Sequence, residues 1–423
     1  MTDLEHPKPD RHHAQPFPPP SPAEPAPNQT PAYVPLAIVV ALLLAIGVFG
    51  SWWAFLIVVA LIVCVFLHEL GHFVTAKRAG MKVTEFFLGF GPRIWSFRRG
   101  EVEYGLKAIP AGAYVRIIGM NNLEEVPAAD EPRTYRQKGY WSRLSVAVAG
   151  SAMHFLIAIV LLVTVIGFFG LQRDTAWKIA QVSPNSPALV AGLQAGDRVT
   201  AIDGIPVATF NELTTQIRAR PNQSVELTVR RADGTTEQLS TTLASRNPAN
   251  EAVGFLGIGE ARDYVRDSLP AAVVGSGEEF GRIAWQSVVG LSKVFSPEGV
   301  RGYVDALTNK PSAASAGAGT GDPSPRLVTP IGVAQLRPNG VADFLLLLAI
   351  INISIGLFNL FPVLPFDGGH VVIATYEAAR SRRGKRYYAD IRKMFPVSYA
   401  VMGVFLFFVV GSLWLDVFRP VGG

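Results

Sequence analysis

The sequence predicts an α-helical polytopic membrane protein of four or five transmembrane helices, with a small membrane-associated β region and one inserted α+β domain. Three observations lead to this fold class. Hydrophobic residues make up 49% of the 423 residues and charged residues only 17%, which is less charge than a soluble protein of this length usually carries. Long apolar runs recur along the chain. A polar stretch at 175–262 interrupts them and has the residue pattern of short strands.

The chain begins with a tail and an accessory helix. Residues 1–32 are rich in proline and polar residues and cannot bury a core, so we expect a disordered cytoplasmic tail. The apolar block that follows is longer than the roughly 20 residues that one spanning helix needs. It predicts an accessory transmembrane helix within 33–50, a turn at Gly50-Ser51 and a second helix from 52 to about 76. One long tilted helix is the alternative.

The segment 51–171 forms the first part of the predicted membrane core. Basic residues follow the helix at 52–76 and mark its cytoplasmic end: Lys77, Arg78, Lys82, Arg93, Arg98, Arg99 and Lys107. Residues 100–120 alternate glycine with β-branched and aromatic residues, which predicts short strands with turns. A second basic stretch, which includes Arg143, precedes an apolar run at 144–171, so this helix should lead outward.

The remaining segments complete the topology. Residues 172–265 form the inserted domain, with a hairpin signal at Ala232-Asp233-Gly234. Residues 266–340 combine amphipathic helices with a small-residue linker at 310–326. The second core part, 341–423, holds an apolar run broken by prolines and a last helix at about 396–416. If the helices alternate in direction, every basic patch is cytoplasmic and the inserted domain is outside the plasma membrane.

Composition excludes two classes of function. The net charge of +5 is modest, and no stretch combines dense Lys/Arg with aromatics, so we expect no nucleic-acid partner. Cys64 is the single cysteine of the chain, so no intramolecular disulfide can form, and it is interpreted as a packing residue.

The stretch FLHELGHFVTAKRAG at 66–80 places three ionisable side chains at the end of an apolar helix. His68 and His72 are four residues apart and share one helix face, so both can offer nitrogens to one ion, and zinc suits such donors. Glu69 lies where it could take a proton from a water on the metal. The alternative is a pair of core histidines, but burying these three groups within the membrane is costly unless they share a metal.

A catalytic zinc usually takes a third protein ligand. Asp367, in the sequence PFDGGH, is an acid at membrane depth that nothing else in the sequence explains. Prolines interrupt the preceding helix and two glycines follow, so irregular backbone could turn this carboxylate inward. His370 is the competing candidate, and a helix cap is the alternative role for Asp367.

These motifs together resemble the site-two protease family of intramembrane zinc metalloproteases. The resemblance is carried by HELGH at 68–72, FFLGFGPRIWS at 86–96 and NLFPVLPFDGGH at 359–370. It implies that His68, His72 and Asp367 bind Zn²⁺ and that Glu69 is the general base. It also implies that a strand near Gly112, Ala113 and Tyr114, together with Asn359, binds the substrate backbone.

The chain departs from the family pattern in its second core helix, where His154 replaces the usual asparagine. We expect His154 to lie near the metal without ligating it. The sequence SPNSPALVAGLQAGDRVTAIDGIPV at 183–207 resembles the PDZ domains of bacterial proteases. Such a domain binds extended peptides as an added strand, and on the outer side it could act as a size filter.

The resemblance implies regulated intramembrane proteolysis within the lipid bilayer. The expected partner is a trimmed single-span membrane protein, such as an anti-sigma factor, and clearance of remnant signal peptides is an alternative. A transporter or metal-handling membrane protein would also bury histidine and aspartate, but gives no reason for Glu69 at that spacing. A PDZ-bearing scaffold with an inactive site is a further alternative.

Overall fold

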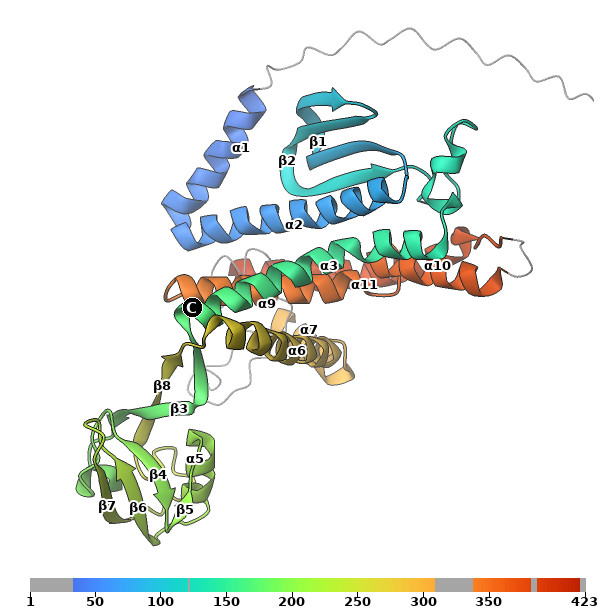
Figure 1. The fold of residues 1–423 in the computed structure, drawn as a ribbon. Helices are drawn as coiled ribbons and strands as arrows, with labels where there is room; N and C mark the ends of the chain where they lie inside the picture. Colours follow the sequence, from blue (N-terminus) through green and yellow to red (C-terminus); the bar gives the residue numbers. More distant parts are fainter. Residues whose placement is uncertain (1–32, 121, 309–337, 382–385, 419–423) are drawn as a thin grey trace, which may run out of the picture.

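A computed structural model describes residues 33–120, 122–308, 338–381 and 386–418 (Figure 1). The predicted tail at 1–32 and the predicted linker at 310–326 lie outside these ranges. Within the described ranges, four helices are long and apolar enough to cross a membrane: Trp52–Arg78, Tyr140–Phe169, Val341–Asn359 and Ile391–Asp416. A shorter apolar helix covers Ala37–Val48. The prediction of a polytopic helical membrane protein agrees with these four helices.

The accessory segment and the first core helix meet at a sharp turn. Helix α1 (Tyr33–Ala45) continues as a π-helical turn at Ile46–Gly50. Helix α2 (Trp52–Arg78) then begins, because the Ser51 side chain accepts a hydrogen bond from the Ala54 amide and caps it. The predicted turn at Gly50-Ser51 is confirmed, and the single long helix is not formed.

Strands β1 (Val83–Arg99) and β2 (Val102–Ile117) form a sheet above α2, and each strand folds back on itself (Figure 1). Residues 85–88 of β1 therefore pair with 103–106 on one side and with 113–116 on the other. Gly89 makes the bend in β1: its φ is +88°, and a Cβ there would lie 2.8 Å from the Ile109 carbonyl oxygen. The expectation of short strands with turns within 100–120 agrees with this arrangement in part: Val102–Ile117 is one strand, but its two halves pair with different segments on either side of a bend.

Helix α3 (Tyr140–Thr164) and the π-helical turn that follows it (Val165–Phe169) form the second core span. The helix begins at Tyr140, four residues before the predicted start, so Arg143 lies inside it and is buried. The basic residue interpreted as a topology signal is thus part of the helix packing.

The inserted domain follows α3 and is joined to it by a two-stranded stalk, in which β3 pairs with β8. Beyond the stalk is a four-stranded sheet of order β5-β4-β6-β7 with two short helices. The elements are β3 (Leu171–Val182), α4 (Pro187–Val190), β4 (Arg198–Ile202), β5 (Ile205–Pro206), α5 (Phe210–Arg218), β6 (Ser224–Arg230), β7 (Thr236–Thr242) and β8 (Ile258–Val265). The core is apolar and includes Trp177, Leu213 and Leu227. The predicted hairpin at 232–234 joins β6 to β7.

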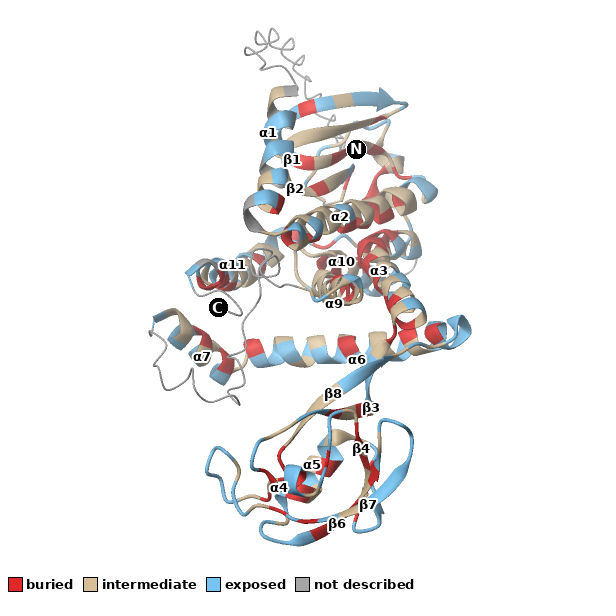
Figure 2. Ribbon diagram, turned by 90° about the vertical axis from the view of Figure 1, so that its left-hand side faces the viewer, coloured by how far each residue is buried: buried red, intermediate tan, exposed pale blue. Residues whose placement is uncertain are grey.

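Two helices follow the stalk. Helix α6 (Leu269–Val294) crosses beneath the core helices and packs against α3 and α9 through Phe280 and Ile283 (Figure 2). Helix α7 (Pro297–Thr308) contacts the last span, where the Tyr303 hydroxyl donates to the Phe408 carbonyl oxygen at 2.7 Å.

The C-terminal part contains α9 (Val341–Asn359), α10 (Asp367–Arg380) and α11 (Phe395–Phe418). The break between α9 and α10 occupies 360–366 and contains Pro362 and Pro365. Gly368 and Gly369 allow this break to fold onto the start of α10, since Cβ atoms there would lie 2.2 Å and 2.6 Å from backbone atoms of Leu360 and Leu364. Asp367 is therefore the first residue of α10.

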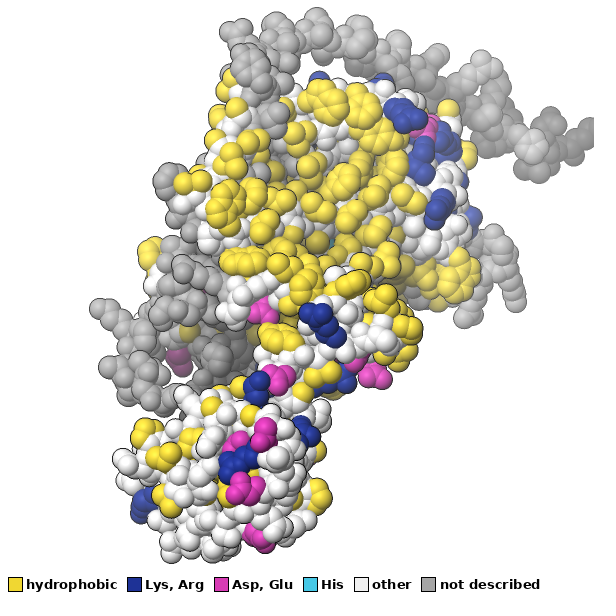
Figure 3. Space-filling view, turned by 60° about the vertical axis from the view of Figure 1, so that its left-hand side comes forward, with side chains coloured by type: hydrophobic (Ala, Val, Ile, Leu, Met, Phe, Trp, Pro, Cys, Tyr) yellow, Lys and Arg dark blue, Asp and Glu magenta, His cyan; other side chains and the backbone are white. Residues whose placement is uncertain are grey.

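The apolar and polar regions of the surface correspond to the apolar and polar segments of the sequence. A broad apolar face covers the helical part, whereas the inserted domain is mostly polar (Figure 3). The domain and its stalk leave one end of the helical part, and α10 lies at the other end (Figure 1).

Candidate metal centre

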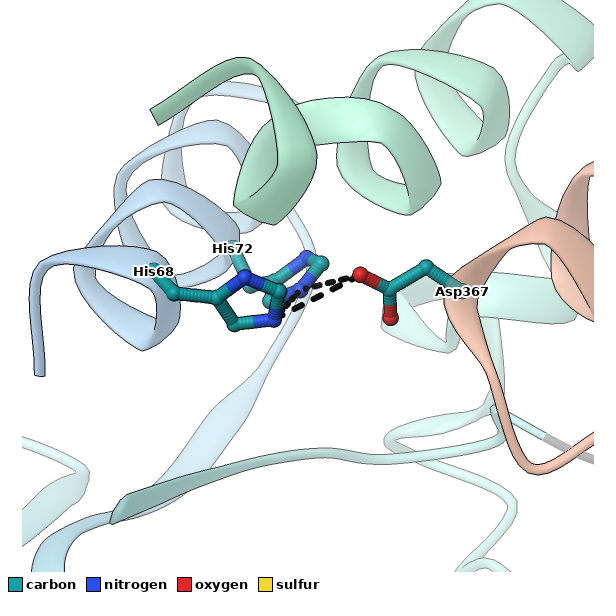
Figure 4. Close-up of side chains that lie close together, drawn as sticks. All are labelled: His68, His72 and Asp367. Atoms are coloured by element: carbon teal, nitrogen blue, oxygen red, sulfur yellow. Dashed lines mark hydrogen bonds and ion pairs between the residues drawn. The ribbon is translucent and has the colours of Figure 1, made fainter. Parts of the chain in front are cut away.

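Three potential ligands from two distant parts of the chain meet at one point. The Nε2 atoms of His68 and His72, on α2, lie 3.4 Å and 3.3 Å from Asp367 Oδ2, at the start of α10, and 3.1 Å from each other (Figure 4). Both histidines are buried. Among the described residues, this is the one group of three or more histidine, cysteine, aspartate or glutamate side chains that could hold a metal ion. Neither His154 nor His370 belongs to it.

The spacing of these atoms fits zinc. Ligand atoms about 2.0–2.1 Å from a tetrahedral ion lie roughly 3.3–3.4 Å apart, which is close to the three distances observed here. Asp367 Oδ2 is buried and has no hydrogen-bond donor in the described part of the chain. A buried carboxylate oxygen facing two imidazole nitrogens is costly unless a cation satisfies all three. Two nitrogens and one oxygen also form a common zinc ligand set.

The orientation of His72 is fixed by a backbone contact. Its Nδ1 atom lies 2.7 Å from the Val146 carbonyl oxygen on α3, which can only accept a hydrogen bond. The proton of the neutral ring is therefore on Nδ1, so the lone pair of Nε2 points toward Asp367. Such a contact to the second nitrogen is typical of metal-binding histidines.

Small residues allow α3 to approach α2 closely. A Cβ on Gly71 would lie 2.7 Å from the Ala149 carbonyl oxygen, and a Cβ on Gly150 would lie 2.2 Å from the His68 ring. Close contact through small residues is the usual way in which membrane helices pack. The glycine inside HELGH therefore has a packing role, which brings the histidines against α3.

Glu69 lies beside the three potential ligands and contacts the sheet. Its Oε2 atom accepts a hydrogen bond of 3.0 Å from the backbone amide of Val115, in the folded-back half of β2. The HELGH helix and this strand are thus in direct contact. This contact has no signal in the sequence, because it depends on how β1 and β2 fold.

His154 belongs to a buried network behind the site. Its Nδ1 atom lies 2.8 Å from Asn352 Oδ1, and its ring centroid lies 5.0 Å from that of His68. The Asn352 amide donates to the Leu348 carbonyl oxygen and to Cys64 Sγ, so its oxygen is the acceptor for His154. The sequence marks Asn352 only as a polar residue in an apolar run, and no role was predicted for it.

The far end of α10 is held by a buried ion pair. Arg143 Nη1 and Glu377 Oε2 are 2.6 Å apart, with side chains only 10% and 3% exposed. Glu377 also accepts hydrogen bonds from the Asn122 side chain and the Ala389 amide. This ion pair fixes α10, and with it Asp367, against α3.

The other predicted site residues lie around this centre. Asn359 is the last residue of α9, before the break that leads to Asp367. Gly112 lies at the bend of β2, where its φ is +150°. Ala113 follows in the half of β2 that contacts Glu69, while the Tyr114 hydroxyl donates to Glu85 and stays within the sheet. His370 packs edge-on against Tyr135 and is not one of the three potential ligands.

Comparison with known proteins gives a consistent result. The model of Peptidase family M50 matches residues 56–404. Zinc metalloprotease Rip1 of Mycobacterium tuberculosis (strain H37Rv) is 31% identical over 411 residues, which cover 86% of this chain and 97% of that protein. Metalloprotease MmpA of Caulobacter vibrioides is 28% identical over 405 residues, which cover 85% and 95%.

Among solved structures, the PDZ domain of the SdrC-like protein from Listeria monocytogenes matches 22% of this chain and 92% of its own, at 22% identity. The TM-score of 0.19 is too low to establish a fold. The family match covers both HELGH and the aspartate of FDGG, and it confirms the predicted zinc enzyme. The chain therefore belongs to peptidase family M50, the site-2 protease family of zinc metalloproteases.

Proposed function

We propose that this membrane protein hydrolyses peptide bonds inside the transmembrane segments of single-span membrane proteins. The observation that carries the proposal is the meeting of His68 and His72, on helix α2, which is long and apolar enough to cross a membrane, with Asp367 at the start of α10, and with Glu69 beside them. A soluble substrate would not need a site on these helices.

In this proposal, His68, His72 and Asp367 hold the zinc ion. A zinc ion held there would supply Lewis-acid activation of water and of the scissile carbonyl group. Glu69 takes a proton from the attacking water and returns it to the leaving amine nitrogen. His154 lies behind His68 and, through Asn352, keeps the site ordered.

Substrate binding uses the sheet. A transmembrane helix satisfies its carbonyl groups internally, so it has to unwind before any bond can be attacked. The outer edge of β2, from Ala113 to Ile117, can pair with the unwound segment as an added strand. Asn359, the last residue of α9, binds the substrate backbone in this proposal. Gly112 provides the bend that brings this edge to α2.

The substrate we propose is a membrane protein already trimmed on its outer side, such as an anti-sigma factor, and the function is then site-two cleavage in transmembrane signalling. Basic residues support a cytoplasmic location for the end of α2 and for α10. The inserted domain, which we interpret as PDZ-like, then lies outside and acts as a size filter against untrimmed proteins. Remnant signal peptides are short enough to pass the same filter, and they form the second substrate class.

The experiment compares three purified variants with the wild-type protein in zinc-containing detergent. Glu69→Gln should lose cleavage of a single-span substrate and keep its zinc. Asp367→Ala should lose both zinc and cleavage. Glu226→Gln, at an exposed position of the inserted domain, is the matched control and should keep both.

Two results would refute the proposal. If the wild-type protein cleaves no trimmed single-span protein, and cells carrying Glu69→Gln accumulate no membrane-bound fragment, intramembrane hydrolysis is wrong. If Asp367→Ala retains full zinc, the assignment of the third ligand is wrong. Zinc transport into vesicles that persists in Glu69→Gln would instead support a metal-handling protein.

A further inference from the structure

The half of β2 that contacts Glu69 is the edge of its sheet. Residues 113–117 pair with 83–88 of β1 on one side. No strand in the described part of the chain pairs with their other side. An open groove of about 580 Å³ runs along residues 114–117 and is bordered by Met120 and Glu124. An extended chain could therefore lie against this edge.

Alternate residues of this segment point their amides in opposite directions. The Ile118 amide donates to the Lys82 carbonyl oxygen, so it points toward β1. By alternation, the amides of Arg116 and Tyr114 point the same way. The Val115 amide points outward, and its partner at 3.0 Å is Glu69 Oε2. Ala113 and Ile117 are its neighbours on the outward side.

The hydrogen bond from the Val115 amide restricts the conformation of the Glu69 side chain, which the proposed reaction uses as the general base. A glutamate side chain has several rotatable bonds and loses considerable conformational entropy when it is fixed. The Val115 amide is the one hydrogen-bond donor to the Glu69 carboxylate found among the described residues. It belongs to backbone that a paired strand holds in place, so it defines one position for Oε2.

We propose that the Val115 backbone amide is the positioning group for Glu69, so that the strand that binds the substrate also aims the general base. The amides of Ala113 and Ile117, on either side of Val115, then pair with the substrate. This inference rests on the proposed proteolytic function. It predicts that binding of the substrate strand and alignment of Glu69 depend on the same short segment.

The test deletes single backbone amides and leaves the side chains unchanged. The α-hydroxy acid analogue of valine is incorporated at position 115 of the full chain, which replaces the amide by an ester. The matched control is the analogue of alanine at position 113, an outward position without contact to Glu69. For each protein, zinc content, kcat and KM for a trimmed single-span substrate are measured in detergent.

The ester at 115 should lower kcat on the order of 10- to 100-fold with one zinc per chain retained, because a hydrogen bond to a charged group is lost. The ester at 113 should raise KM with kcat largely kept. An unchanged kcat at 115, an effect on KM alone, or loss of zinc would overturn the proposal. A wild-type protein that cleaves no such substrate would instead contradict the proposed function, so the two failures are distinguishable.

Discussion

A single methyl group added at Gly150 should strongly weaken zinc binding. In Gly150→Ala, the new Cβ would lie 2.2 Å from His68 Cε1, 2.5 Å from His68 Nε2 and 2.5 Å from His72 Nε2. Ordinary contacts begin near 3.4 Å, so each ring has to retreat by about 1 Å. His72 cannot do so without breaking its 2.7 Å contact with the Val146 carbonyl oxygen.

The expected loss of zinc affinity follows from how little the ligand atoms can be displaced from the ion. Zinc–nitrogen distances are about 2.0–2.1 Å, and ligands work within roughly 0.2 Å of these values. A displacement several times larger should lower zinc affinity by at least about 100-fold, at the upper end of the effect of losing a supporting contact. Elsewhere in a helix, replacing glycine by alanine is favourable by up to about 1 kcal/mol.

The assay is zinc content by mass spectrometry, together with competition against a chromogenic chelator. Gly403→Ala is the matched control, because no atom lies within 4 Å of the Cβ position there. It should keep one zinc per chain and unfold at or above the wild-type temperature. A Gly150→Ala protein with wild-type zinc affinity would refute the placement of these histidines against α3.

Three further predictions concern the surroundings of the site. Arg143→Met should destabilise the protein by about 3–5 kcal/mol, because it leaves Glu377 buried without its cation, and the double variant with Glu377→Leu should recover much of the lost thermal stability. Hydrogen bonds from Arg133 and Lys77 hold the pKa of Glu101 at about 2, below its ordinary value of 4.5. Its stabilising contribution is therefore complete above pH 4.5 and is lost as the pH falls toward 2, so Glu101→Gln should unfold more easily at pH 7 and flatten the urea-unfolding profile over that window. Removal of zinc by a chelator should lower the unfolding temperature and stop cleavage, and added Zn²⁺ should restore both; an unfolding temperature that does not change would contradict a metal bound to the folded state.

Local patterns in the sequence were sufficient for the long helices, for the shared face of His68 and His72 and for the helix break at Asp367. That Asp367 meets the histidines was indicated by the need for a third ligand and by the resemblance to the site-two protease family. Two histidines four apart share a helix face whatever surrounds them. The prolines and glycines around Asp367 break the helix by their own backbone restrictions. Both signals act over a few residues, and the predicted turn at Gly50-Ser51 is of the same kind.

The sheet could not be predicted in the same way. The pairing of 113–117 with 83–88 depends on bends in two strands, and the motif at 86–96 does not reveal that it forms the partner strand. The contact between Val115 and Glu69 is a consequence of that pairing. The pattern of residues 100–120 therefore predicts short strands with turns, but not the segments with which they pair.

Buried polar partners were also missed. Arg143 was interpreted as a charge outside the membrane, because its partner Glu377 is 234 positions away and nothing nearby marks the pair. Asn352 and His154 are 198 positions apart. The role of a buried charge or amide can be assigned only when its partner in space is known. Local sequence patterns do not reveal a partner that is so far away along the chain.

The wide separation of the site's components along the chain bears on biosynthesis. Asp367 is made long after the HELGH helix has left the ribosome, so a nascent or truncated chain carries two imidazoles without the carboxylate that completes them. On the ligand assignment and the function proposed above, such a chain cannot cleave other membrane proteins that are being inserted beside it. The proposal therefore implies that the enzyme is inactive until residue 367 has been translated.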